Sequence, residues 1–476
     1  MKSVSRSWPT AFLPIAILVA SCSRPPEPAP TPAPPGPAEL AFRDAVDGPP
    51  PGWTGPVFAL SHNYPTTPPI CDSPWLKRKV DFNAAKPTWP GANNEWSDYV
   101  QDIVNYVKEG QDPDLRDEIG WRADVNGSTR WFHVPWMAFD GERGREFVHG
   151  LTNELSTSAS TFNGPGRGTG LHELPGATSP SGDGPYFETW SIGFYNPCGA
   201  ATLGQGWPAS GEPATYTDDK GRLLARGMPF PEGTVVVKLL NTTADETVVP
   251  YLKGSTSWQA NAHTQTGSTY SMCERTVRRV HLVQIDLAVV DLRSPTRWVY
   301  STLGYDGNLP GKTVWDRLKP LGVQWGNDHE SYPAVAQAQS KPLRETLLAP
   351  VGTPEHYGCN KRLAGVVDQA NSSCVSCHMG AYAAPPGVIQ VQGTNVPAIF
   401  GFPGPAAQGM CSEFNQANSN YFSDYAYPMP FPQSTGEVAA AIPLDSSLQV
   451  QVAFAQYAVF KNPNVPRVCP DAGATK

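Results

Sequence analysis

The sequence predicts an α+β protein of several domains, in which a β-rich domain with a sandwich or jelly-roll-like core precedes a small, mainly α-helical domain. The chain has 476 residues, more than one hydrophobic core usually holds. Strand-like apolar runs recur between residues 45 and 345 without regular alternation with helices, and an apolar, helix-like segment lies at 448–460. We therefore expect a leader at 1–21, a tether at 22–44, the β-rich domain at 45–345 and the helical domain at 346–476.

The first 21 residues have the pattern of an export signal. Lys2 and Arg6 supply the positive start, and the apolar stretch at residues 11–20 is too short to span a membrane. Small residues then precede Cys22. This segment resembles the lipobox of bacterial lipoproteins, and the resemblance implies that Cys22 is lipidated. The alternative is a plain secretory signal with an incidental cysteine. Ser23, in place of Asp, favours sorting to the outer membrane, so we expect a lipoprotein of the bacterial cell envelope, periplasm-facing or at the surface.

The segment that follows is rich in proline. Residues 23–40 read SRPPEPAPTPAPPGPAEL, a composition that builds no core and favours extended polyproline II structure. We expect a semi-rigid spacer that holds the folded part away from a membrane to which Cys22 is anchored.

The region at 45–345 carries strand patterns and one clear helix. Residues 235–240 form an apolar run, residues 283–289 alternate between apolar and more polar side chains, and residues 298–303 are rich in strand formers. A helix is predicted where Trp96, Tyr99, Val100, Ile103, Val104 and Val107 share one face. Asn93 or Asn94 is its expected cap, and Gly110 its expected stop.

Two clusters in this region mix aromatic and polar residues. One spans residues 131–149 and includes His133, Asp140 and His149; the other is Trp325-Gly-Asn-Asp-His329. Such groups can bind a polar organic ligand. The alternative is that the aromatic side chains fill the core while the charged side chains pair on a loop surface, and this is the interpretation that we favour.

The cysteine count fits an oxidising compartment. Of nine cysteines, one is the expected lipid site and two belong to the motif described next. The six others are expected to form three disulfides, whose pairing the sequence leaves open, or a mixture of paired and reduced thiols. They are Cys71, Cys198, Cys273, Cys359, Cys411 and Cys469.

Residues 374–378 read Cys-Val-Ser-Cys-His, the CxxCH pattern of covalent haem attachment. The spacing lets the thiols of Cys374 and Cys377 add to the two vinyl groups of one porphyrin edge, and places His378 under the iron. A redox CxxC pair or half of a zinc site is the alternative. No second Cys or His pair follows at close spacing, so the motif predicts one haem c.

Beyond the motif, residues from about 344 to the end resemble class I cytochromes c. The resemblance lies in CxxCH, then residues 397–401 (PAIFG), then Met429-Pro430, then the apolar segment at 448–460. It implies that Met429 is the distal iron ligand. His356 or an open site is the alternative, whereas Met379 adjoins His378 and Met410 adjoins Cys411. The helix that this family places before CxxCH is not clear in residues 359–373.

The larger region resembles uncharacterised bacterial monohaem cytochrome-like proteins. The matching stretches are residues 131–152, 193–207 and 298–328. This resemblance implies no particular activity.

Charge and motifs together define three hypotheses of function. The chain has 43 acidic and 35 basic residues, with a formal net charge of −8, which argues against nucleic acid as a partner. The first hypothesis, which we favour, is one-electron transfer with redox partner proteins. The second is an oxidoreductase whose large N-terminal domain acts on a small molecule, and the third is a haem sensor or binding module.

Overall fold

The computed structural model describes the parts of the chain that position the CxxCH motif. These are residues 50–83, 94–116, 120–137, 139–140, 144–145, 151–158, 186–207, 228–266, 269–326, 344–348, 363, 365–368, 373–379, 381–383 and 442–461. The expected leader and tether, with Cys22, lie outside them, and so do His356, Met410 and Met429.

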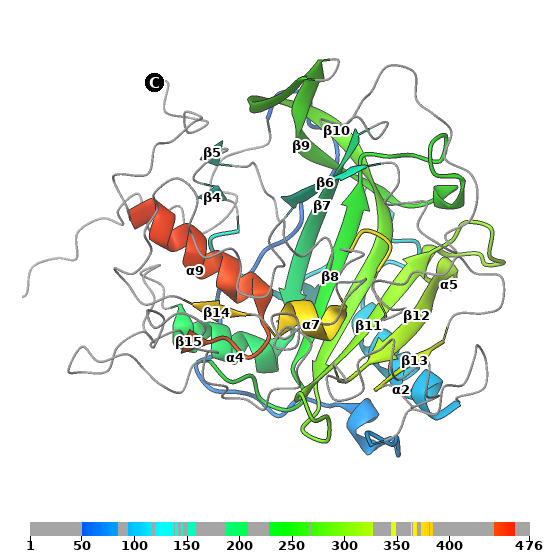
Figure 1. The fold of residues 1–476 in the computed structure, drawn as a ribbon, viewed down its shortest axis with the longest axis vertical. Coiled ribbons are helices and arrows are strands. Elements are labelled where there is room, and N and C mark those ends of the chain that lie inside the picture. Colours follow the sequence, from blue (N-terminus) through cyan, green and yellow to red (C-terminus); the bar gives the residue numbers. More distant parts are fainter. Residues whose placement is uncertain are drawn as a thin grey trace, which may run out of the picture.

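A nine-stranded antiparallel sheet dominates the described residues (Figure 1). Its main path runs in the order β13-β12-β11-β10-β8-β7-β3, with β6 also pairing with β7 and β9 with β10. The strands are β3 (Phe132–His133), β6 (Thr152–Ser158), β7 (Tyr186–Tyr195), β8 (Val235–Thr242), β9 (Ser257–Thr266), β10 (Thr269–Val290), β11 (Trp298–Tyr305), β12 (Leu318–Gln324) and β13 (Glu345–Leu347).

Short helices and small strand pairs surround this sheet. The pairs are β1 (Asp124–Val125) with β2 (Ser128–Thr129), β4 (Phe139–Asp140) with β5 (Gly144–Arg145), and β14 (Tyr382–Ala383) with β15 (Ile442–Pro443). The helices are η1 (Pro74–Lys77), α2 (Asn94–Lys108), α4 (Pro197–Gly206), η2 (Pro250–Leu252), α5 (Val314–Arg317), α7 (Cys374–His378) and α9 (Leu448–Lys461). In this part of the chain, no helix is long and apolar enough to cross a membrane.

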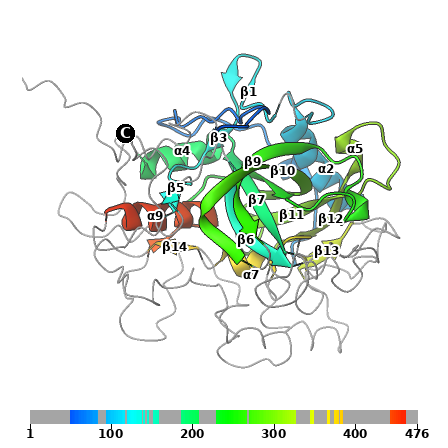
Figure 2. The same ribbon diagram turned by 90° about the horizontal axis from the view of Figure 1, so that it is seen from above.

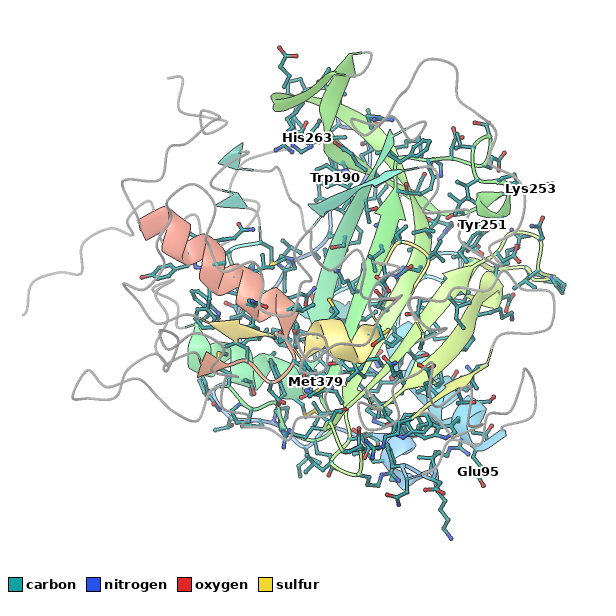
Figure 3. The ribbon with its side chains drawn as sticks, in the orientation of Figure 1. Glu95, Trp190, Tyr251, Lys253, His263 and Met379 are labelled. Atoms are coloured by element: carbon teal, nitrogen blue, oxygen red, sulfur yellow. A yellow bond between two sulfur atoms is a disulfide. The ribbon has the colours of Figure 1, made fainter. Side chains whose placement is uncertain are left out.

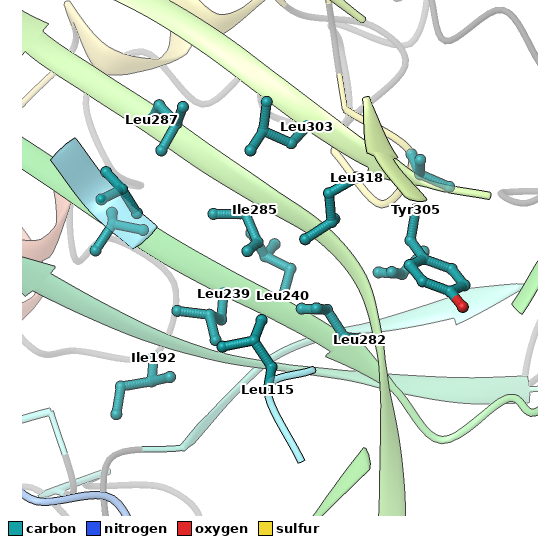
Figure 4. Packing of buried hydrophobic residues seen from close by; sticks show 14 of the residues in the cluster. Leu115, Ile192, Leu239, Leu240, Leu282, Ile285, Leu287, Leu303, Tyr305 and Leu318 are labelled. Atoms are coloured by element: carbon teal, nitrogen blue, oxygen red, sulfur yellow. The ribbon is translucent and has the colours of Figure 1, made fainter. Parts of the chain in front are cut away.

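The two faces of the sheet bury different clusters, because successive side chains of a strand point to opposite faces. On β8, Val235, Val237 and Leu239 join the larger cluster, which also includes the apolar face of α2. Figure 4 shows part of this packing. On β11, Trp298 and Tyr300 join the second cluster, which α4, α7 and α9 share. Figure 2 shows α2 and α7 on opposite sides of the sheet.

The predicted elements of the β-rich region are confirmed. The three expected strands lie within β8, β10 and β11, and all six apolar residues of the expected helix face are buried in α2. Gly110 follows that helix with a φ of 75°, a conformation that suits glycine at a helix end. The large antiparallel sheet with few helices confirms the β-rich part of the predicted fold class, whereas its division into a sandwich or jelly roll stays a prediction.

The described residues beyond 345 pack on this same sheet. The expected helix at 448–460 is present as α9. Strand β13 begins at Glu345, the last residue of the expected β-rich domain, extends beyond it to Leu347 and pairs with β12. The domain boundary at 345 stays a prediction, as does a separate helical domain.

One of the expected disulfides joins Cys71 to Cys198. It closes a loop with a sequence separation of 127 residues, which in a chain-entropy model stabilises the fold by about 4–5 kcal/mol. Cys359, Cys411, Cys469 and the side chain of Cys273 lie outside the described part.

Candidate functional site

The CxxCH motif forms the short helix α7, which lies against β11 on the face of the sheet opposite α2 (Figures 1 and 2). Val375, between the two cysteines, is fully buried in the cluster that contains Trp298 and Tyr300. Burial of such a side chain stabilises a fold by about 1.5–3 kcal/mol. The backbone N–H of Val375 also donates to Oε1 of Gln324 on β12, at 2.9 Å. The motif is therefore anchored to the sheet by its own central residue.

The side chains of Cys374, Cys377 and His378 line one cavity between α7, the start of α9 and the sheet. Its volume is about 150 Å³. Neither cysteine is part of a disulfide bond. The structure thus brings together three of the four residues that the sequence predicts to hold a haem, and the fourth, Met429, lies outside the described residues.

His378 is held by a backbone carbonyl group. Its Nδ1 atom lies 2.9 Å from the carbonyl oxygen of Ser446. Because a carbonyl only accepts, Nδ1 carries the hydrogen and Nε2 is the nitrogen that can ligate a metal. The Tyr300 ring packs at 4.7 Å from the imidazole, centroid to centroid, with an interplanar angle of 37°. The orientation of His378 is therefore set from two sides.

Asp445 fixes the loop that carries this carbonyl. Its buried carboxylate accepts hydrogen bonds from the Phe230 backbone N–H at 2.8 Å and from the Trp298 indole at 3.2 Å, and Arg297 lies at 3.4 Å. Asp445 and Ser446 both have positive φ, at 46° and 65°, which few non-glycine residues adopt without such support. Burial raises the pKa of Asp445, and the charge of Arg297 opposes this effect.

Ser447 joins the same loop to α9 and to β7. Its hydroxyl lies 2.6 Å from the Tyr195 hydroxyl and accepts the backbone N–H of Val450 at 3.2 Å. A serine that accepts a backbone N–H in the first turn is a typical helix N-cap. The start of α9 is therefore tied to the sheet beside His378.

The floor of the cavity includes a polar row of three residues on adjacent strands. Lys238 on β8 is the cross-strand neighbour of Asp286 on β10, which is the neighbour of Thr302 on β11. The Asp286 carboxylate accepts a hydrogen bond from the Thr302 hydroxyl at 2.8 Å and another from the Gln284 side-chain amide at 2.9 Å. Burial raises the pKa of Asp286 well above its usual value, and the negative charge of Asp368 adds to this effect.

The Cys374 thiol lies in surroundings that keep it neutral. Burial raises its pKa well above the usual value, and the charges of Asp368 and Asp286 act in the same direction. Reactive cysteines of redox CxxC motifs have lowered pKa values instead, in electropositive surroundings. These surroundings therefore do not favour the thiolate form of Cys374.

No described member of the two mixed aromatic clusters of the sequence is among the residues that line this cavity. Trp131 is buried in the larger core, and the ring of buried His133 lies 5.6 Å from that of His62. Trp325 stacks on Trp96 of α2 at 4.0 Å. These described members fill the core, as we favoured, whereas His149, His329 and the side chain of Asp140 lie outside the described part.

A second buried titratable pair lies at the other end of the sheet. Glu188 on β7 accepts from the Trp190 indole at 2.9 Å and contacts Nδ1 of His263 on β9 at 2.9 Å. Figure 3 shows Trp190 and His263 near each other, away from Met379 beside α7. This pair links β7 to β9 and is not among the residues that line the cavity.

Comparisons with protein-family models, with curated proteins and with solved structures find no match for this chain. Sequence reasoning had named Cys374, Cys377 and His378, but it missed Tyr300, Ser446 and the polar row. The only signal for the row was the alternation of polar with apolar residues at 283–289.

Proposed function

We propose that this protein is a c-type cytochrome that carries one haem and transfers single electrons. The observation that carries the proposal is that Cys374, Cys377 and His378 line one cavity while the Ser446 carbonyl holds Nδ1 of His378. Metal-ligating histidines typically donate their second ring N–H to such an acceptor, which orients the ring and raises its basicity.

The residues present fit a haem c. The two thiols would hold it through thioether bonds, which need cysteines outside any disulfide, as both are. Nε2 of His378 would be an axial ligand, with the ring kept in place by Tyr300 and Ser446. When bound, the haem supplies an iron centre that accepts and releases one electron.

The distal ligand, the finer fold and the location belong to the same proposal. Met429 is proposed as the distal ligand, because a thioether raises the reduction potential and closes the iron to small ligands. Residues 346–476 are proposed as a cytochrome c-like domain, and 45–345 as a sandwich or jelly-roll-like domain. Lipidated Cys22 and the proline-rich tether would hold the protein at an envelope membrane, where redox proteins are its partners.

The direct test is the double variant Cys374→Ala, Cys377→Ala, expressed in a host that matures c-type cytochromes. Its chain should carry no covalent haem after denaturing electrophoresis and haem staining. Ser376→Ala is the matched control, because it changes the motif at a position that the chemistry leaves open. If the double variant stains as strongly as the control, the attachment site is wrong.

One observation favours a second function, that of a small-molecule oxidoreductase. The cavity extends from the three haem-attachment residues to the polar row of Lys238, Asp286 and Thr302, which provides polar groups for a substrate. An enzyme of this kind would have its haem reduced rapidly by one specific compound. A carrier would exchange electrons only with redox proteins.

A further inference from the structure

Two carboxyl groups face the cavity beside α7. They belong to Asp286 on β10 and to Asp368, which ends the turn at 365–368. Both residues are half-buried and line the cavity, and both act on the Cys374 thiol through their charges. A haem attached at Cys374 would fill this cavity and exclude the water that reaches the two groups. The proposed function gives this pair of acids no role.

The side chain of Gln284 joins the two carboxyl groups. It is fully buried, and its Nε2 atom donates to both carboxylate oxygens of Asp286, at 2.9 and 3.1 Å. Its Oε1 atom accepts the backbone N–H of Val367, the residue before Asp368, at 3.0 Å. A Cβ atom at Gly365 would collide with both the Gln284 amide and the Asp368 carboxylate, so these two side chains meet there. The two acids are therefore held on either side of one amide group.

The positive charge beside this pair balances only one of its two negative charges. Lys238 on β8 is the cross-strand neighbour of Asp286, and its charge acts on that carboxyl group. Among the described residues that line the cavity, it is the only lysine or arginine. An excess charge without water is unfavourable, and a carboxylate in such a place takes up a proton more readily. In agreement with this, burial and the charge of Asp368 raise the pKa of Asp286 well above its usual value.

The other titratable groups nearby do not change their charge together with this pair. They are Cys374, Cys377 and His378 on α7, Tyr195 on β7, Tyr300 on β11 and Glu345 on β13. In the haem-loaded chain the two thiols would be thioethers and the histidine an iron ligand, so none of the three would titrate. Burial raises the pKa of both phenols, which keeps them neutral at neutral pH. The Glu345 carboxylate is turned toward Gln324 and Leu363, from which it accepts hydrogen bonds.

The protonation of an acid beside a haem is coupled to the oxidation state of the iron. A ferric haem carries one more positive charge than a ferrous haem, and this charge stabilises a nearby carboxylate. Reduction removes the charge, so the carboxyl group then binds a proton from water more readily. The coupling is reciprocal, and protonation of the acid therefore raises the reduction potential.

We propose that Asp286 and Asp368 together form a proton acceptor that is linked to reduction of the haem. When the haem accepts one electron from a redox partner protein, the pair takes up one proton from water, and it releases this proton when the electron leaves. The proposal deepens the proposed function and rests on it, because it needs a haem attached at Cys374. It adds that electron transfer by this protein depends on the pH.

The test is a redox titration of the full haem-loaded chain at a series of pH values between 5 and 8. The wild-type reduction potential should fall as the pH rises, by at most about 59 mV per pH unit, which corresponds to one proton per electron. In Asp286→Asn the remaining carboxylate is balanced by Lys238, so the slope should decrease at least twofold. Asp72→Asn is the control, because this carboxylate is exposed, and it should keep the wild-type slope.

A second variant and a second measurement make the test independent of one substitution. Asp368→Asn removes the like charge beside Asp286, so the sloping part of the curve should move to lower pH. The proton itself can be counted with a pH indicator in weakly buffered solution. Wild-type protein should take up protons from the solution on reduction, and each of the two variants should take up fewer at neutral pH.

Two results would overturn the proposal while leaving the proposed function intact. They are a wild-type reduction potential that does not change over this pH range, and equal slopes for the wild type and both aspartate variants. A chain without covalent haem would overturn the proposed function and this proposal with it. Haem staining detects that outcome separately, so the two failures are distinguishable.

Discussion

The Nδ1 atom of His378 lies 2.9 Å from the carbonyl oxygen of Ser446, a residue 68 positions further along the chain. The carbonyl is presented by a loop in which Asp445 accepts hydrogen bonds from Phe230 and Trp298. Asp445 thus acts on His378 through its neighbour, and we regard it as a positioning residue.

Asp445→Asn should destabilise the protein and raise the reduction potential of the proposed haem. Asparagine tolerates positive φ, but it replaces one acceptor oxygen by a donor group beside Phe230 or Arg297, at a cost of about 2 kcal/mol. A weaker hydrogen bond from His378 Nδ1 to the Ser446 carbonyl would make the His378 imidazole less basic. A less basic ligand would stabilise ferric iron less. Urea unfolding and redox titration measure the two effects. Asp72→Asn is the control, because this carboxylate is exposed. It should change the stability by less than about 0.5 kcal/mol and leave the reduction potential unaltered. An equal response of the two variants would refute the positioning role of Asp445.

Asp286 should make the fold less stable as the pH rises. Burial raises its folded-state pKa, so the unfolded chain loses this proton first, near an ordinary pKa of about 3.9. Stability therefore falls from that pH up through the raised folded pKa, by at most about 1.4 kcal/mol per pH unit.

Asp286→Asn should flatten this dependence. Lys238 and Asp368 act on Asp286 through their charges, Cys374 and His378 line the same cavity, and all four residues are unchanged in the variant. Urea unfolding midpoints between pH 4 and 7, on wild type and variant, give the difference directly. Parallel curves for the two proteins would show that Asp286 does not titrate as expected.

The elements that the sequence predicts well are those with a local signal. The apolar face of α2 repeats within one helix, and the strand at 235–240 is a single apolar run, so both could be located without tertiary contacts. The CxxCH motif is local in the same sense, because its chemistry fixes the spacing of Cys374, Cys377 and His378.

What the sequence could not predict are contacts between distant residues. Val375 donates to Gln324, which lies 51 positions away, and this contact is part of what places α7 on the large sheet. Lys238 and Asp286 are neighbours because of the register of β8 and β10. The alternation along each strand says which residues share a face, but not which residue of the other strand lies opposite. The positive φ of Asp445 and Ser446 likewise depends on partners supplied by other elements.

Met429→Ala should open the iron. If the Met429 thioether is the distal ligand, the oxidised wild-type protein shows a weak near-infrared sulfur-to-iron band and its ferrous form excludes carbon monoxide. The variant should lose this band, have a lower reduction potential and bind carbon monoxide. Met410→Ala is the matched control and should resemble wild type. Ready carbon monoxide binding by the wild-type ferrous protein would favour the sensor or enzyme hypothesis instead.

Cys22→Ser should release the protein from the membrane. The lipid on a modified Cys22 would be the only anchor that we propose, and the variant should appear in the soluble periplasmic fraction. Mass spectrometry of the mature wild-type N-terminus provides the check, because an unmodified terminus would exclude lipidation.

The most direct test of the central claim is to measure the haem that stays on the denatured wild-type chain. The full-length protein, produced in a host that matures c-type cytochromes, is denatured and extracted with acidic acetone, which removes haem that is not covalently bound. We predict one haem per chain in the residue, attached to the peptide that contains Cys374 and Cys377. A chain that keeps no haem after this extraction would contradict the proposal that the protein is a c-type cytochrome.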